Sequence, residues 1–338
     1  MINKMKKDKQ INKKEVQVAP ITAKSDLFLP FLLIAVCTVI GLAALIIDKF
    51  IFEFGNDLLA PLIGQIIILV IPAYLFIQLT KRDISFADQL KDIGFGKLRA
   101  DHIFFMIFTA LFMMSTSFIL NTLFYGIYKA SEGFTILGIF TAGNGEYTVS
   151  APYLILVYAL FPAIFEELLF RGILYKEFSR INEPFAIVTS SLISAIFAFT
   201  IGGFPAAFFC ALAYCFIRYV TKTLQACIVV HFLFNIYALY LQTNLCKYIM
   251  SSTGNILLLI VTLALWLIFS ILFFSECGKI FKQKGDKIKS GEEKSSFPSF
   301  KLNLLKADIF SILRHTPTLV CIIICLAVFV SVVVIRIF

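Results

Sequence analysis

Long apolar runs are the feature that most limits what this chain can fold into. Hydrophobic residues make up 59% of its 338 residues, and charged residues only 15%. About 20 consecutive apolar residues in a helix cross a bilayer, and lipid admits only helices and closed barrels because every backbone polar group must be paired. The sequence therefore predicts an all-α polytopic membrane helix bundle with about 8–9 transmembrane helices. The expected spans are about 27–47, 58–79, 103–125, 151–175, 184–201, 205–220, 224–242, 255–275 and 318–337.

Basic residues gather at two places, which accounts for much of the net charge of +9. Residues 1–26 are predicted to form a disordered basic cytoplasmic tail, and 278–317 a basic cytoplasmic loop. Lysine-rich segments alternate with acidic or neutral ones, and by the positive-inside rule this places the N-terminus in the cytoplasm. Charge placed in this way favours contact with anionic membrane lipids, and no nucleic-acid-binding motif accompanies it. Residues 84–95, which alternate apolar and charged side chains, are expected to lie on the membrane surface.

Two adjacent carboxylates, Glu166 and Glu167, interrupt the fourth apolar run. Ionisable groups inside a membrane cost about 3 kcal/mol each on insertion scales, so they are kept where they face a partner or a wet cavity. Arg171 follows Glu167 at i,i+4, which gives this acid a counter-ion on its own helix. Glu166 has no such partner. Pro162, four residues before Glu166, removes a helical hydrogen bond and is expected to bend the helix.

A second polar pair, His231 and Asn235, lies in the seventh run and shares one helix face at i,i+4. A membrane histidine can take a proton, bind a metal or donate a structural hydrogen bond. Asn235 can orient the imidazole, stabilise an oxyanion or form an interhelical hydrogen bond. Beside an unpaired glutamate from another span, His231 predicts a pair that activates water for hydrolysis of an amide.

These residues resemble the CPBP family, the CAAX prenyl endopeptidase and bacteriocin-processing (Abi) intramembrane proteases. Glu166, Glu167 and Arg171 match its Glu-Glu-x-x-x-Arg motif, and His231 and Asn235 match its His-x-x-x-Asn motif. The resemblance implies a four-helix core at 151–243, between N-terminal transmembrane helices at 27–150 and C-terminal ones at 244–338. It implies a bacterial-type cell membrane as the location.

The resemblance also implies roles for the site residues. Glu166 would be the general base, His231 and Asn235 would position the water and the oxyanion, and Glu167 and Arg171 would support them. The substrate or partner would be a membrane-associated peptide, lipoprotein or partner protein.

One family motif is degenerate in this chain. Ile201 stands where Phe-x-x-x-His has its histidine, in Phe197-Ala-Phe-Thr-Ile201. With one site histidine a metal is not expected, since zinc usually takes three protein ligands, and the cofactor is unknown. Thr200 or Ser194 can hydrogen-bond in place of the imidazole but cannot accept a proton. Two hypotheses stay open: an intramembrane endopeptidase, and a catalytically inactive membrane scaffold or chaperone-type partner that keeps the fold. A transporter is a weaker alternative.

Overall fold

The fold is known from a computed structural model that describes residues 27–47, 60–81, 85–128, 151–197, 203–242, 256–290 and 314–337. These residues are largely helical, and none of them lies in a β-strand. The fold is therefore all-α, as the apolar runs predict. The predicted tail at 1–26 lies outside the described residues, as does the larger part of the predicted loop at 278–317.

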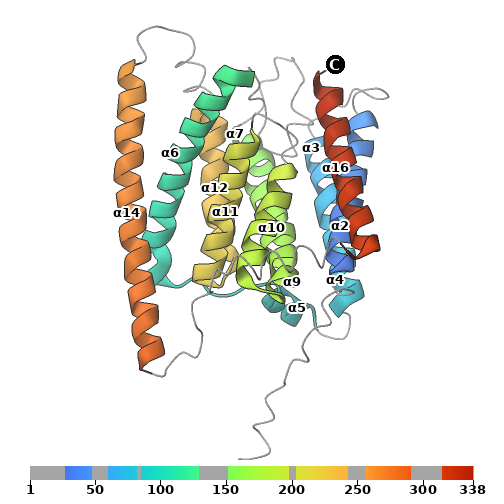
Figure 1. Cartoon of the computed structure of the whole chain (residues 1–338), viewed down its shortest axis with the longest axis horizontal. Helices are drawn as coiled ribbons and strands as arrows, with labels where there is room; N and C mark the ends of the chain where they lie inside the picture. Colours follow the sequence, from blue (N-terminus) through green and yellow to red (C-terminus); the bar gives the residue numbers. More distant parts are fainter. Residues whose placement is uncertain are drawn as a thin grey trace, which may run out of the picture.

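The central part of the bundle is made of four consecutive spans, drawn in green to yellow-orange in Figure 1. The first is one helix in which α-helical and wider π-helical turns alternate. Its segments are α7 (Ala151–Leu154), η6 (Ile155–Leu160), α8 (Phe161–Glu167), η7 (Leu168–Leu174) and α9 (Tyr175–Ser179). The other three spans are α10 (Glu183–Ile196), α11 (Phe204–Thr221) and α12 (Leu224–Tyr237), which continues as η8 (Ala238–Gln242).

Further helices flank this central part on both sides (Figure 1). On one side α2 (Phe28–Ile47) packs against α16 (Thr316–Ile337), near α3 (Ala60–Gln65), η3 (Ile66–Val70) and α4 (Ile71–Lys81). On the other side α6 (Ile103–Tyr128) packs against α14 (Ile256–Lys289). At 34 residues, α14 is about 51 Å long at 1.5 Å per residue, which exceeds the thickness of the hydrocarbon core.

Six of the described helices are long and apolar enough to cross a membrane, and three shorter apolar helices accompany them. The six are Pro61–Thr80, Ala100–Leu123, Ala151–Ser179, Phe204–Thr221, Leu224–Leu241 and Leu257–Asp286, and the three are Phe28–Ala44, Glu183–Ile196 and Thr316–Val332. Each corresponds to one of the expected spans, so the polytopic helix bundle is confirmed. The helix of the eighth span ends later than expected, at Lys289 rather than near 275.

Short capped connections join the central spans. Asn182 caps α10 by accepting a hydrogen bond from the backbone N–H of Phe185 at 2.6 Å, and Pro184 stands in the first turn, both common at helix starts. Thr223 caps α12 in the same way, accepting from Ala226 at 3.4 Å. Between α11 and α12 the chain turns at Lys222, whose φ of 57° is left-handed. A connection of this length makes α11 and α12 antiparallel neighbours.

A short segment after α5 (Phe86–Asp92) is attached to the end of the central spans where α11 meets α12. The backbone N–H of Leu224 donates to the carbonyl of Gly94 at 2.8 Å. The guanidinium of Arg218 donates to the carbonyl of Ile93 at 3.4 Å, and the N–H of Gly96 donates to Gln225 Oε1 at 2.9 Å. The segment predicted to lie on the membrane surface is thus anchored to α11 and α12.

Candidate active site

Wide helical turns flank the two carboxylates. The π-helical segments η6 and η7 lie directly before and after α8, whose last residues are Glu166 and Glu167. Such turns insert an extra residue into the helix and occur often at functional sites. Pro162 stands in the first turn of α8, where its missing N–H leaves an i−4 carbonyl without its usual donor. The wider turns change the register of the carboxylates relative to a uniform α-helix.

Glu167 and Arg171 form a fully buried ion pair, as the i,i+4 spacing predicts. Arg171 Nη1 lies 3.0 Å from Glu167 Oε1, and the two side chains are 1% and 0% exposed. The guanidinium also donates to the backbone carbonyl of Ala211 at 3.1 Å and to Ser194 Oγ at 3.4 Å. Arg171 therefore ties its own span to α10 and α11 while it balances the charge of Glu167.

His231 on α12 contacts both carboxylates. Its Nδ1 lies 2.8 Å from Glu167 Oε1, and its Nε2 lies 3.9 Å from Glu166 Oε2. The structure thus brings together the acid of the fourth span and the imidazole of the seventh, as the sequence analysis requires. The closer of the two contacts is with Glu167, which the sequence pairs only with Arg171.

Tyr214 on α11 is a site residue that the sequence analysis missed. Its ring stacks on the imidazole of His231, with centroids 4.6 Å apart and planes at 21°, and the guanidinium carbon of Arg171 lies 5.0 Å from the same ring. Its hydroxyl is buried and has no hydrogen-bond partner among the described residues. A single tyrosine in an apolar run carries no motif, so the signal appears only when the helices are packed.

Asn235 lies one turn beyond His231 on α12 and is also buried. Its Nδ2 donates to the backbone carbonyl of Ala159 in η6 at 3.1 Å. This is the interhelical hydrogen bond that the sequence analysis left open as an alternative. The amide has a second N–H, so a role toward an oxyanion stays a prediction.

The degenerate motif ends outside the described residues, which include neither Thr200 nor Ile201. Ser194, the other candidate for a substitute, accepts a hydrogen bond from Arg171. Within the described ranges no group of three or more His, Cys, Asp or Glu side chains is arranged to hold a metal ion. Whether the protein uses a metal stays a prediction.

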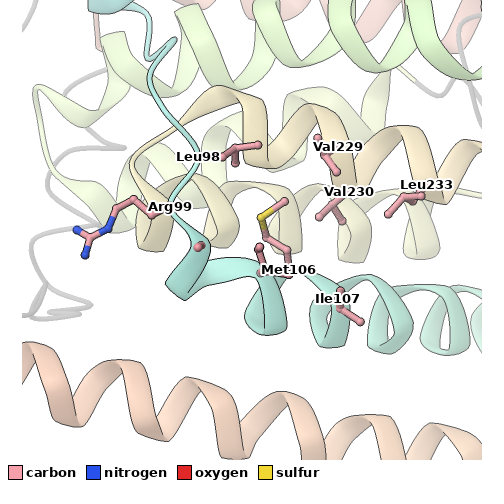
Figure 2. A pocket seen from close by; sticks show the side chains of 9 residues that line it. Leu98, Arg99, Met106, Ile107, Val229, Val230 and Leu233 are labelled. Atoms are coloured by element: carbon pink, nitrogen blue, oxygen red, sulfur yellow. The ribbon is translucent and has the colours of Figure 1, made fainter.

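An apolar pocket of about 350 Å³ lies between α6 and α12 (Figure 2). It is lined by Leu98, Arg99, Ala100, Ile103, Met106, Ile107, Val229, Val230 and Leu233. Figure 2 shows the side chain of Arg99 directed away from the others, and its guanidinium pairs with Asp101. None of the lining residues is a carboxylate or a histidine, but Val230 precedes His231, so the pocket and the carboxylate site share α12.

Comparison with known protein families gives a match for the central part of the chain. Residues 148–237 match the family model described as type II CAAX prenyl endopeptidase Rce1-like. No curated protein and no solved structure gives a significant match. The matched range contains both glutamates, Arg171, Tyr214, His231 and Asn235, and it confirms the resemblance seen in the motifs.

Proposed function

We propose, from the CAAX prenyl endopeptidase domain at residues 148–237, that this chain is an intramembrane endopeptidase that hydrolyses a peptide bond with a glutamate-activated water. The observation that carries the proposal is the position of His231, whose two ring nitrogens face the carboxylates of Glu167 and Glu166. Titratable groups inside a membrane are costly, and groups gathered in this way occur mostly at functional sites.

In the proposed reaction Glu166 is the general base. Its carboxylate takes a proton from a water molecule as the water oxygen attacks the carbonyl carbon of the substrate. The same proton then passes to the departing amine, the C–N bond breaks, and the new carboxylic acid, which keeps the second proton of the water, leaves with the amine. The balance needs no further reactant.

The other site residues hold the imidazole in place. Nδ1 of His231 faces Glu167, and Nε2 faces Glu166. When the neutral imidazole carries its proton on Nδ1, the nitrogen directed toward Glu166 is the unprotonated one. Arg171 balances the charge of Glu167, so Glu167 is a positioning residue rather than a second base. Asn235 is proposed to orient the substrate carbonyl with the amide hydrogen that does not bond Ala159.

The substrate proposed is a membrane-associated peptide or lipoprotein. The matched family is described as a CAAX prenyl endopeptidase, and the apolar pocket between α6 and α12 suits a hydrocarbon chain carried by such a substrate. Because the pocket shares α12 with His231, a chain held there would keep the attached peptide near the carboxylates. Membrane lipids are the other partner we propose, in a bacterial-type cell membrane with the N-terminus cytoplasmic.

The test is cleavage of a farnesylated fluorogenic peptide and of a lipid-modified peptide by the purified chain in proteoliposomes. The expected result is cleavage by the wild type, and loss of about 100-fold or more in Glu166→Gln and His231→Ala. Glu276→Gln is the matched control, because Glu276 pairs with Lys279 on α14, away from the site. Equal cleavage by wild type, Glu166→Gln and His231→Ala would remove the peptidase proposal.

Ile201 favours a second candidate function. With isoleucine in place of the motif's histidine, the chain would be a non-catalytic scaffold or chaperone-type partner that keeps the fold. Under this candidate Ile201→His creates cleavage that the wild type lacks, and capture of a partner protein survives Glu166→Gln. Under the peptidase proposal the wild type already cleaves.

A further inference from the structure

Two lysines from distant parts of the chain lie against one tyrosine at the end of the central spans. Lys222 Nζ lies 4.5 Å from the ring centroid of Tyr219, and Lys284 Nζ lies 5.0 Å from the same centroid. Lys284 Nζ is also 3.5 Å from the tyrosine hydroxyl. Lys222 comes from the turn after α11 and Lys284 from the last part of α14, so tertiary packing alone brings these two charges together.

The carboxylate of Glu183 lies beside these charges. Glu183 Oε1 lies 3.4 Å from Lys222 Nζ, and the other oxygen of Glu183 accepts a hydrogen bond from the hydroxyl of Tyr175. The guanidinium of Arg218 adds a third positive charge nearby. Partial burial lowers the pKa of Lys222, and the charges of Lys284 and Arg218 lower it further, although Glu183 opposes this change. Lys222, Lys284 and Arg218 therefore place three positive charges close together.

The backbone at Lys222 adds to this observation. Lys222 ends α11 with a φ of 57°, a left-handed conformation that glycine or asparagine adopts more readily. Its backbone N–H donates to the carbonyl of Arg218 at 3.0 Å, which any residue could do. The side chain of Lys222 is therefore not needed to end the helix, and it is held in place by the ring of Tyr219 and by Glu183.

The cluster lies at the level where a bilayer's polar headgroups are expected. Lys222 stands between the spans that end at Thr221 and begin at Leu224, and Lys284 stands near the end of the span Leu257–Asp286. Outward-facing side chains of α14, such as Leu267 and Ile271, are exposed on the surface of the protein, where the acyl chains of a lipid would lie. Lysines directly beyond a membrane span attract anionic lipid headgroups.

We propose that Lys222, Lys284 and Tyr219 form a binding site for the phosphate of an anionic membrane lipid. The two ammonium groups bind the phosphate, and the tyrosine ring holds them in position. The lipid bridges α14 to the turn between α11 and α12, and so fastens the long outer helix to the spans that carry the candidate active site.

The test measures the midpoint of thermal unfolding of the purified full chain in neutral detergent at constant ionic strength. Phosphatidylglycerol, phosphatidylcholine and inorganic phosphate are added separately at equal phosphate concentration. We expect phosphatidylglycerol to raise the midpoint by about 3 °C or more over phosphatidylcholine. The variant Lys222→Asn/Lys284→Gln should lose most of this rise, since asparagine tolerates the left-handed backbone and both charges are gone.

The matched control is Lys282→Gln/Lys289→Gln, which removes two exposed charges from the same helix. This control variant should keep the rise in the unfolding midpoint with phosphatidylglycerol, because the proposed site is intact. An equal loss in this control would show diffuse attraction and overturn the proposal. A full rise in the unfolding midpoint of Lys222→Asn/Lys284→Gln would also overturn the proposal. So would no rise in the wild type, or an equal rise with inorganic phosphate. Peptide cleavage plays no part in these outcomes, so they stand apart from the test of the proposed function.

Discussion

Nδ1 of His231 lies 2.8 Å from Oε1 of Glu167, an oxygen that also lies 3.0 Å from Arg171 Nη1. Glu167 therefore holds an arginine of its own span and the imidazole of another at a single atom. This contact orients the ring so that Nε2 faces Glu166 at 3.9 Å. The two neighbouring glutamates thus have different surroundings, which supports the proposed division into a positioning acid and a reacting acid.

The pair of Glu167 and Arg171 should be strongly coupled in stability. Each of Glu167→Gln and Arg171→Met leaves the other group buried without its counter-charge, which typically costs about 3–5 kcal/mol. The double variant should cost clearly less than the sum, because it leaves no unpaired charge. Unfolding in mild detergent of the wild type and the three variants measures this coupling. Additive costs would contradict a direct ion pair.

Tyr214 should keep His231 in its orientation through the ring rather than the hydroxyl. Tyr214→Phe retains the stacking on the imidazole, whereas Tyr214→Leu removes it, along with an aromatic contact worth about 0.5–1.5 kcal/mol. Diethyl pyrocarbonate should therefore modify His231 faster in the leucine variant and at the wild-type rate in the phenylalanine variant. Mass spectrometry can separate the sites, since the chain has 3 histidines. Equal rates in all three proteins would refute a positioning role for the ring.

Asn235 should contribute to stability through its bond to Ala159. Asn235→Ala removes this interhelical hydrogen bond, which we expect to cost about 1 kcal/mol. Asn121→Ala is the control: Asn121 is also buried, but its amide donates to Ser117 one turn away on the same helix. Thermal unfolding should show the larger loss for Asn235→Ala. The reverse order would mean that the contact with Ala159 does not hold η6 to α12.

Gly94 should be far less tolerant of a side chain than Gly96. Gly94 has a φ of 104°, and a Cβ there would lie 2.0 Å from Arg218 Nη2. Gly94→Ala should cost about 1–3 kcal/mol in backbone strain and displaced guanidinium. At Gly96 no atom lies within 4 Å of an added Cβ, so Gly96→Ala should stay within about 0.5 kcal/mol of the wild type. Equal unfolding midpoints for the two variants would place the segment after α5 away from α11.

Local patterns in the chain predicted much of the fold. Apolar runs of about 20 residues mark the spans because a bilayer core has a set thickness, and all nine expected spans have a helix. The pair of Glu167 and Arg171 follows from i,i+4 spacing on one helix, and the start of α10 follows from Asn182 and Pro184. Each of these depends on residues close together in the sequence.

The contacts between spans depended on the tertiary structure. Glu167 with His231, His231 with Tyr214, and Asn235 with Ala159 each join different spans, and the π-helical turns around α8 set which way the carboxylates point. Many of the spans are apolar on most faces, so polarity does not show which face of each helix is turned inward. The rotation of each helix about its own axis is decided by side-chain packing between helices. The sequence alone determined that this is a membrane helix bundle with two polar motifs, and only the packing decided which atoms of those motifs meet.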